Sequence, residues 1–300
     1  MSKKKILILE KIHESGIKIL KKKFNVTVNI NLRKNEIYKK IKNYHIIIIK
    51  STTSVDYKLL SYSEKLELVG RAGTGLDNID LNLIKKNKIK LLHTPNSSTE
   101  AVADFTIMSI LLGIKNFSRA IKMVSNSDYR RSLLMGKNIS EINVGIVGYG
   151  KIGKLVSKRL KKLGAKLSIL DPKIKNKMTL NKILKHSDVI SFHLPLIKET
   201  KILIGYEEMK KMKEGVILIN TSRAKIFNKN FYKTSKKILL ITDVISPEPS
   251  YNSKNNKNFK HVWLKKDNII FTPHMASMTN ETQEKISMEL ANKIIRYYDV

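Results

Sequence analysis

The stretch NVGIVGYGKIG, residues 143–153, decides the fold of this chain. It opens with a run of the length of a buried strand, continues into three glycines at the spacing GxGxxG, and ends where a helical pattern begins. A strand, a glycine turn and a helix in this order are what a dinucleotide-binding fold needs. Gly148 permits the tight turn, Gly150 lets a pyrophosphate approach the backbone, and Gly153 lets helix and strand pack closely.

The residues after the glycine turn indicate which dinucleotide is bound. The helix that opens with Lys151 and Ile152 would present its N–H groups and positive dipole end to the phosphates. Asp171 ends the next apolar run, where a carboxylate accepts hydrogen bonds from both ribose hydroxyls and repels a 2′-phosphate. The sequence therefore predicts NAD, although Lys173 and Lys175 soften the exclusion of NADP. A structural glycine turn with a capping aspartate is the alternative interpretation.

Two series of short apolar runs alternate with lysine-rich helical segments. The runs lie at 5–10, 26–30, 45–49 and 66–69, then at 143–147, 166–170, 189–192, 216–220, 238–242 and 269–271. This alternation favours parallel sheets covered by helices. We predict an α/β protein with two Rossmann-like or flavodoxin-like parallel-sheet domains and a cleft between them. The outer domain would comprise 1–95 plus 276–300, and the dinucleotide domain 96–275, entered through one long helical segment at 99–123.

Composition excludes several classes of function. The 300 residues include no cysteine, which excludes disulfides, thiol catalysis and thiolate metal sites, and no metal cofactor is predicted. No apolar run is long enough to span a bilayer, and the first run lacks a signal-peptide cleavage site, so a cytoplasmic protein without a membrane partner is expected. The net charge of +33 is spread over scattered lysines, which favours compositional bias over a specific nucleic-acid surface.

Five motifs span nearly the whole chain in a fixed order. They are GRAGTGLDNID (70–80), HTPN (93–96), GYGKIG (148–153), NTSR (220–223) with DVISPEP (243–249), and TPHMAS (272–277). The ordered set resembles the D-2-hydroxyacid dehydrogenase family, and the first motif is particularly similar to phosphoglycerate dehydrogenases. Longer phosphoglycerate dehydrogenases continue into a regulatory C-terminal domain. Since this chain ends at Val300, the resemblance implies a short form without serine feedback through such a domain.

The resemblance implies a catalytic trio of Arg223, Glu248 and His274. Oxidation of a secondary alcohol removes a hydride from carbon and a proton from oxygen, and His274 would take that proton. Glu248 would orient the imidazole, and Arg223 would hold the substrate carboxylate with its planar fork. Taken singly, these residues could be a strand-end histidine, a loop carboxylate and a surface cation. Their family order favours the catalytic interpretation.

The resemblance also implies the residues of two binding sites. The predicted cofactor-binding residues are Thr74, Gly148, Gly150, Lys151, Ile152, Gly153, Asp171, Leu194, Thr221, Ser222 and Asp243. The predicted substrate-binding residues are Lys50, Ser51, Ala72, Gly73, Asn96 and Arg223. His193, in the sequence HLP, matches a family loop near the cofactor. Lys50 stands where the family has an arginine, so it keeps the positive charge and loses the bidentate fork.

Three departures from the family pattern bear on activity. Ala224 and Lys225 stand where two glycines usually follow the catalytic arginine. The segment from Arg223 to Asp243 is a few residues shorter than usual, and the family's Gly-Lys-Thr before the cofactor strand is replaced by Glu-Ile-Asn at 141–143. These departures leave open a degenerate NAD-binding interaction protein that has lost catalysis.

The sequence predicts an enzyme as the first hypothesis. It would catalyse the NAD-dependent oxidation of 3-phosphoglycerate to 3-phosphohydroxypyruvate, a step of serine biosynthesis. The alternative within the family is a glyoxylate or hydroxypyruvate reductase, and a nucleic-acid-binding protein is motivated by net charge alone. The expected partner is a small 2-hydroxyacid or 2-oxoacid, and the resemblance to phosphoglycerate dehydrogenases implies a phosphorylated one. The helical segment after Thr99 is expected to support a homodimer.

Overall fold

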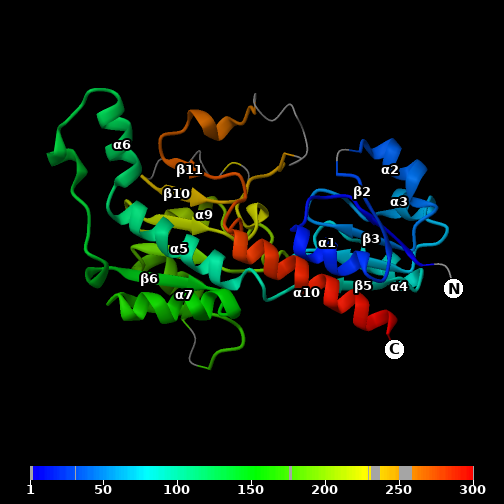
Figure 1. Cartoon of the computed structure of the whole chain (residues 1–300). Coiled ribbons are helices and arrows are strands. Elements are labelled where there is room, and N and C mark those ends of the chain that lie inside the picture. Colours follow the sequence, from blue (N-terminus) through cyan, green and yellow to red (C-terminus); the bar gives the residue numbers. More distant parts are fainter. Residues whose placement is uncertain are drawn as a thin grey trace. The chain divides into compact units, whose positions relative to one another are not determined.

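The computed structural model describes residues 3–30, 32–175, 178–228, 230, 237–249 and 259–299. They form two compact units, whose elements are labelled in Figure 1. Unit 1 is built from Met1–Ser98, Pro249–Phe259 and Ser277–Val300, and unit 2 from Thr99–Glu248 and Lys260–Ala276. Both are parallel sheets covered by helices, which confirms the predicted fold class.

Unit 1 has a five-stranded parallel sheet in the order β2-β1-β3-β4-β5. The strands are β1 (Lys5–Ile8), β2 (Asn25–Val28), β3 (Ile46–Ile49), β4 (Leu68–Arg71) and β5 (Lys90–His93). The helices are α1 (Glu14–Lys21), α2 (Lys34–Ile41), α3 (Tyr57–Ser61), α4 (Leu81–Lys86) and the C-terminal α10 (Asn280–Tyr298), which lies along α1 in Figure 1.

β3 consists of four isoleucines and shows no alternation of polar and apolar residues, because both of its faces are buried. Ile46 and Ile48 pack into the core shared with α1 and α10, whereas Ile47 and Ile49 pack into the core shared with α2 and α3. Side chains alternate between the two faces of a strand, and here both faces are covered by helices. All four side chains are therefore fully buried.

Unit 2 has a six-stranded parallel sheet in the order β11-β10-β9-β8-β6-β7. The strands are β6 (Asn143–Val147), β7 (Lys166–Leu170), β8 (Val189–Phe192), β9 (Ile217–Asn220), β10 (Leu239–Thr242) and β11 (Ile269–Phe271). The α-helices are α5 (Thr99–Ile114), α6 (Phe117–Ser125), α7 (Lys151–Lys162), α8 (Leu180–His186) and α9 (Tyr206–Lys210). The chain runs from β6 outward to β7 and then returns to β8 on the other side, so the strand order reverses at β6. Ligands of open α/β sheets bind at the carboxyl ends of the strands at such a point.

The helical segment predicted at 99–123 is broken in two, so the prediction of one long helix is wrong. Asn116 takes a left-handed conformation with φ 53°, which ends α5 and turns the chain into α6. Asparagine tolerates this conformation better than other non-glycine residues, and its side-chain amide donates to the Met135 carbonyl at 3.0 Å. Among the described residues, no single helix is long and apolar enough to cross a membrane, although the α5–α6 pair, bent by 61°, meets that test of length and composition.

Candidate active site and cofactor site

The glycine turn joins β6 to α7, and two of its glycines are required by the chain's own packing. Gly148 has φ 96°, and a Cβ on it would lie 2.4 Å from the His193 carbonyl oxygen. A Cβ on Gly153 would lie 2.1 Å from the carbonyl oxygen of Gly148. Real Cβ atoms do not approach other atoms so closely, so both positions need glycine even before a ligand is considered.

Gly150 differs, because none of the described residues explains its lack of a side chain. Its φ of −72° suits any residue, and a Cβ on it would meet no described atom within 4 Å. Gly150 is also the N-cap of α7, and no side chain among the described residues caps that helix end. An open backbone at an uncapped helix N-terminus is what a pyrophosphate requires. These residues therefore fit a dinucleotide, with Lys151 and Ile152 opening the helix.

Asp171, directly after β7, is tied to the glycine turn. Its Oδ2 accepts from the Tyr149 N–H at 2.7 Å, and its Oδ1 accepts from the Lys173 N–H at 2.8 Å. The hydrogen bonds from Tyr149 and Lys173 hold the pKa of Asp171 below its ordinary value, so the carboxylate stays ionised. Each oxygen has a second lone pair. Asp171 can therefore accept from a ribose while it also fixes the turn.

His193 and Leu194, directly after β8, line the other side of the turn. The His193 Nε2 lies 3.0 Å from Ser191 Oγ, while its buried Nδ1 has no partner among the described residues. Burial lowers the pKa of His193 to about 4, so the ring is neutral at physiological pH. A Cβ on Gly153 would lie 3.5 Å from the His193 ring and one on Gly148 3.0 Å from Leu194. The match of HLP to a loop near the glycine turn is thus visible in the packing.

The structure brings His274 and Glu248 together at the same edge of the sheet. His274 lies in the turn after β11 with φ 52°, and Glu248 lies in the segment after β10. The His274 Nδ1 is 2.5 Å from Glu248 Oε1, and about a third of each side chain is exposed (33% and 32%). An ionised carboxylate only accepts, so Nδ1 must carry the proton of this hydrogen bond. In the neutral ring, Nε2 is then the acceptor, which suits a general base.

Asp243 has a role that the sequence did not reveal. It is 1% exposed, and its carboxylate accepts from Thr272 Oγ1 at 2.5 Å and from the Met275 and Ala276 N–H groups at 2.8 Å each. Burial raises the pKa of Asp243 above its ordinary value, and these hydrogen bonds oppose that rise. Because its partners stand on both sides of His274, Asp243 fixes the turn that carries the imidazole. β10 and β11 are paired neighbours, a relation that only the sheet order supplies.

Arg223 follows β9 in a loop held by the buried side chain of Asn220. The Asn220 Oδ1 accepts from the Ser222 N–H at 3.0 Å and from Ser222 Oγ at 2.9 Å, and its Nδ2 donates to the Arg223 carbonyl at 3.0 Å. Thr221 Oγ1 lies 3.2 Å from Thr106 Oγ1 on α5. The NTSR motif therefore builds its own loop, and the first residue of the motif is the one that shapes it. Sequence reasoning had not singled out Asn220.

The predicted residues of unit 1 gather at the carboxyl ends of three adjacent strands. Lys50 and Ser51 follow β3, Ala72, Gly73 and Thr74 follow β4, and Asn96 follows β5. Carboxyl ends of parallel strands meet at one edge of a sheet, so these residues share that edge. Thr74, predicted as a cofactor contact, belongs to this group, and its Oγ1 lies 3.4 Å from Ser98 Oγ.

Positive charge is concentrated around Lys50. Burial lowers the pKa of Lys50 below its ordinary value of 10.5, Glu10 raises it, and the cations of Arg71 and Lys11 lower it further. Gly73 has φ 140°, and a Cβ on it would lie 1.6 Å from Arg71 Nη1. The Arg71 guanidinium thus occupies the space that a side chain at position 73 would need. This edge of unit 1 suits an anionic ligand.

A comparison with known families gives the same answer as the geometry. The model of the NAD-binding domain of D-isomer specific 2-hydroxyacid dehydrogenases matches residues 107–276, more than half of the chain. The chain belongs to this dehydrogenase family. The matched range includes the glycine turn, Asp171 and the three residues predicted to be catalytic, and the match confirms the predicted family and NAD as cofactor.

The proteins similar to this chain are named for different substrates. The D-3-phosphoglycerate dehydrogenase of Archaeoglobus fulgidus is 30% identical over 97% of this chain, which spans 56% of that relative's length. The hydroxypyruvate reductase of Thermotoga maritima is 29% identical, and 99% of each chain is covered. The D-lactate dehydrogenase of Aquifex aeolicus, solved with NAD and lactic acid, has a TM-score of 0.86 with 26% identity, covering 98% of this chain and 95% of the other. This chain thus spans about half the length of the archaeal relative.

The altered segment after Arg223 is visible in part. Ala224 and Lys225, which replace the two glycines of the family pattern, begin a 3₁₀ turn at Ala224–Ile226. The Ile204 N–H donates to the carbonyl of Ile226 at 3.1 Å, which joins this turn to the rest of unit 2. The remainder of the shortened segment, residues 229 and 231–236, lies outside the described residues. The backbone after Arg223 therefore continues into a 3₁₀ turn without the two glycines of the family pattern.

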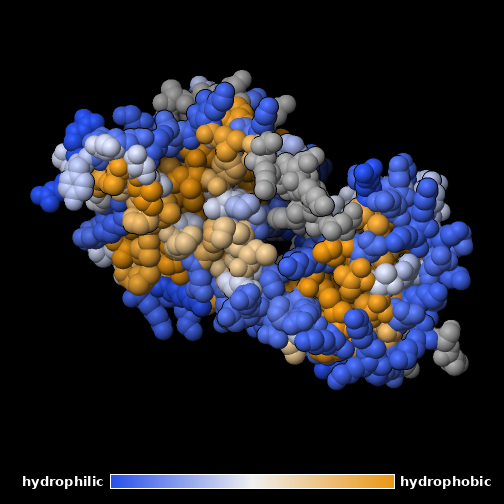
Figure 2. Space-filling model, turned by 45° about the horizontal axis from the view of Figure 1, so that its top comes forward, coloured by the Kyte–Doolittle hydropathy of each residue, from blue (hydrophilic) through white to orange (hydrophobic). Residues whose placement is uncertain are grey.

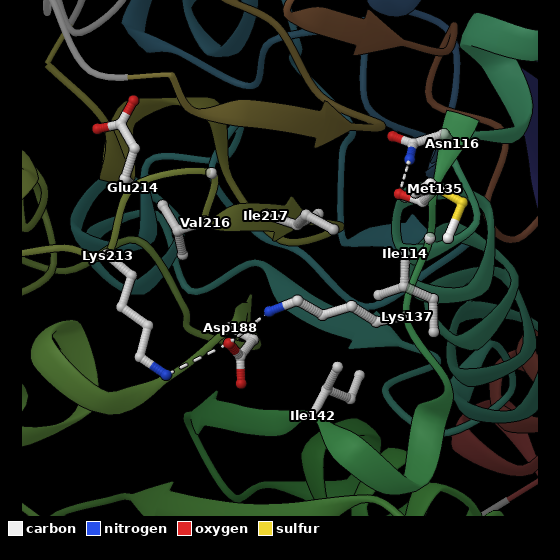
Figure 3. Close-up of a pocket in the computed structure, with 13 residues that line it drawn as sticks. Ile114, Asn116, Met135, Lys137, Ile142, Asp188, Lys213, Glu214, Val216 and Ile217 are labelled. Carbon is white, nitrogen blue, oxygen red and sulfur yellow. Dashed lines mark hydrogen bonds and ion pairs between the residues drawn. The ribbon is translucent and has the colours of Figure 1, made fainter. Parts of the chain in front are cut away.

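A pocket at the opposite, amino edge of this sheet is shown in Figure 3. Lys137 and Lys213 point to Asp188 from two sides, with Nζ to Oδ1 distances of 3.1 and 3.3 Å. Burial raises the pKa of Asp188, but the Asn143 N–H and the two lysines bring it below its ordinary value. None of the described residues that line this pocket belongs to the predicted sites. Lys137 and Lys213 are paired with Asp188, and Glu214 accepts from the Lys237 N–H at 3.0 Å, so these charged groups serve the packing of the strand starts.

Proposed function

We propose that this chain is an NAD-dependent D-2-hydroxyacid dehydrogenase that interconverts a small 2-hydroxyacid and its 2-oxoacid. The hydrogen bond between His274 and Glu248 carries this proposal. It supplies an oriented imidazole at the carboxyl edge of a dinucleotide-binding sheet, and an acid–base group is what the proton of the hydroxyl requires. The bound nicotinamide supplies the hydride acceptor or donor.

Each member of the trio has a defined task. His274 takes the hydroxyl proton on Nε2 in the oxidation and returns it in the reduction. Glu248 keeps the ring in that tautomer and stabilises the imidazolium, as a carboxylate beside a catalytic histidine does. Arg223 binds the substrate carboxylate and polarises the carbonyl oxygen in the reduction. Asp243 keeps the His274 turn in place through Met275 and Ala276.

The cofactor would be held by the glycine turn and the residues around it. Gly148, Gly150, Gly153 and the start of α7 would receive the pyrophosphate, and Asp171 the ribose. The remaining predicted contacts are Thr74, Leu194, Thr221, Ser222 and Asp243. We assign unit 2, with boundaries near 96 and 275, as the NAD-binding domain, and 1–95 plus 276–300 as the substrate domain.

3-Phosphoglycerate is the substrate that we favour. The GRAGTGLDNID motif is similar to phosphoglycerate dehydrogenases, and several relatives carry that name, among them the Archaeoglobus fulgidus protein. A phosphorylated acid brings two anionic groups, and the edge of unit 1 offers cations to meet them at Lys50 and Arg71, beside Ser51, Ala72, Gly73 and Asn96. The reaction would serve serine biosynthesis.

A hydroxypyruvate or glyoxylate reductase is the second candidate. The specific observation in its favour is the match to the Thermotoga maritima hydroxypyruvate reductase, which extends over 99% of both chains. A single anionic carboxylate would need fewer cations than a phosphorylated acid. Lysine in place of arginine at position 50 keeps one positive charge but offers no bidentate fork for a second anionic group.

NADH consumption with a panel of 2-oxoacids tests the proposal. The panel contains 3-phosphohydroxypyruvate, hydroxypyruvate, glyoxylate and pyruvate, with NADPH in parallel and His274→Asn as the inactive control. Highest kcat/KM for the phosphorylated acid supports phosphoglycerate dehydrogenase, and preference for hydroxypyruvate supports the second candidate. NADH binding without turnover of any acid would refute the enzyme and leave a degenerate NAD-binding protein.

A homodimer is the proposed assembly, and α6 supplies the argument for its interface. None of the described side chains of α6 is buried, although Phe117, Ile121 and Val124 recur at helical spacing and are 57%, 54% and 59% exposed. Hydrophilic side chains cover most of the surface visible in Figure 2, and hydrophobic ones gather in separate areas. Ile121→Lys should therefore reduce the mass measured by light scattering, while Tyr57→Lys, an exposed position in unit 1, should not.

A further inference from the structure

Residues 50–53 form a loop after β3, and Glu10 fixes this loop by accepting hydrogen bonds from two of the loop's backbone N–H groups. Glu10 follows β1, the strand that pairs with β3, and is 3% exposed. Its Oε2 accepts from the Thr52 N–H at 3.2 Å and its Oε1 from the Thr53 N–H at 2.9 Å. A carboxylate is withdrawn from water only at a cost, which charge-assisted hydrogen bonds offset. Glu10 thus commits both oxygens to this loop.

Asn78 fixes the same loop by donating hydrogen bonds to two of the loop's backbone carbonyl groups. Its Nδ2 donates to the Lys50 carbonyl at 3.0 Å and to the Thr53 carbonyl at 2.6 Å. Asn78 belongs to the GRAGTGLDNID motif, in which no task had been assigned to it. Glu10 and Asn78 together hold both ends of the 50–53 loop, so its backbone has little freedom to shift.

The ammonium of Lys50 is held by a third residue, from the C-terminal helix. Lys50 Nζ donates to Gln283 Oε1 at 2.8 Å, and Gln283 Nε2 donates in turn to the Ser277 carbonyl at 2.9 Å. An ammonium is a point charge on a flexible stem, whereas a guanidinium is a rigid fork. Gln283 therefore supplies the orientation that the lysine lacks, and it takes one of the three ammonium donors.

Charge reinforces this arrangement. Glu10 is the anion that faces Lys50, and Arg71 and Lys11 are the cations that face it. Without an anion, three cations at one half-buried edge would repel each other and disfavour the protonated lysine. Glu10 therefore acts on Lys50 in two ways, through the backbone of the loop and through its charge.

We propose that Glu10, Asn78 and Gln283 are positioning residues of the substrate site, which hold the 50–53 loop and the Lys50 ammonium in place to bind the anionic group of the 2-oxoacid. This inference rests on the proposed function, because it takes the Lys50 edge as the place where the acid binds. It assigns a reason to the lysine in place of arginine: Gln283 compensates for the missing fork.

The test uses Glu10→Gln and Gln283→Met in the full-length chain, with Glu36→Gln as the matched control. Glu36 also accepts a backbone N–H, that of Arg33 at 2.6 Å, but it lies at the start of α2 and its loss removes the same charge. We expect each site variant to raise KM for the 2-oxoacid and the Kd of oxalate, an inert dicarboxylate, about tenfold, the loss of one hydrogen bond to a charged group. The kcat and the KM for NADH should stay within about twofold in all three variants, by the same reasoning that only the acid site is changed.

Three outcomes separate this inference from the proposed function. An unchanged oxalate Kd in both site variants, with an active wild-type enzyme, would overturn the inference alone. A fall in kcat at constant KM would also overturn it, because it would indicate a general structural defect. The proposed function would be overturned, and the inference kept, if the wild-type protein turned over no 2-oxoacid and the site variants still bound oxalate more weakly than wild type. If Glu10→Gln does not fold, Gln283→Met decides, since Gln283 lies half-buried on α10.

Discussion

Alanine substitutions of the three glycines in the turn should separate the demands of folding from those of cofactor binding. The perturbation is the same at each site, a single added methyl group. At Gly148 the methyl would meet the His193 carbonyl, and at Gly153 it would meet the Gly148 carbonyl, whereas at Gly150 it would meet no described atom within 4 Å. The same mutation therefore acts on two different equilibria.

The expected magnitudes follow from these contacts. Gly148→Ala adds about 1–2 kcal/mol of left-handed backbone strain to about 1–3 kcal/mol of overpacking, and Gly153→Ala incurs the overpacking. For Gly150→Ala, the entropy lost by the unfolded chain stabilises the fold by about 0.4–1 kcal/mol. Alanine is a poorer N-cap than glycine by a similar small amount, so the free energy of unfolding should change by less than about 1 kcal/mol.

Two measurements on the purified apo-protein make the distinction. Urea unfolding should show Gly148→Ala and Gly153→Ala destabilised and Gly150→Ala close to wild type. Titration of NADH fluorescence should show the Kd of Gly150→Ala raised at least about tenfold, or 1.4 kcal/mol, because the methyl occupies the space that the pyrophosphate needs. If Gly150→Ala binds NADH as well as wild type does, the assignment of the open backbone to the cofactor is refuted. If Gly150→Ala unfolds at as low a urea concentration as Gly148→Ala, the space beside Gly150 is not open in the folded protein.

Three further predictions test the active site. His274→Asn should lower kcat by at least about 10²-fold without changing the Kd of NADH. Glu248→Gln should lower kcat by a smaller factor, since the general base remains but loses its orientation. Steady-state kinetics measures kcat, and fluorescence titration measures the Kd of NADH. Because burial lowers the pKa of Lys50, its ammonium is lost as pH rises through that lowered value, so KM for the 2-oxoacid should rise at alkaline pH below 10.5, and Lys50→Arg should keep KM flat over the same range. A KM for wild type that is independent of pH up to 10.5 would contradict the burial of this lysine. Asp171→Ala should weaken NADH binding about tenfold and narrow the preference over NADPH, as it removes both the ribose acceptor and the anchor of the turn; an unchanged ratio of kcat/KM for the two cofactors would count against its role.

Local sequence was sufficient for most of the strands and for the glycine turn, whereas the predicted catalytic residues depended on the resemblance to the family. A buried parallel strand needs apolar residues on both faces, which is why the isoleucines of β3 were recognisable without alternation. The backbone at Gly148 has a positive φ, and glycine is the residue type that adopts a positive φ without steric cost. The break of the helical segment at Asn116 was missed, because left-handed asparagine has no unique signature among the many asparagines of this chain.

Tertiary structure alone decided what each polar side chain holds. The hydrogen-bond partners of Glu10, Asn78 and Asp243 could not be predicted from the sequence, because they depend on which strands and loops become neighbours. Lys50 and Gln283 are 233 positions apart, and they meet because the C-terminal helix returns to the sheet of unit 1. The sequence by itself determined the fold class and the dinucleotide turn, and its resemblance to the family predicted an acid–base pair of His274 and Glu248. Only the tertiary structure showed that Gly150, unlike Gly148 and Gly153, has no described atom within 4 Å of where its Cβ would be, because that space depends on how the surrounding segments pack.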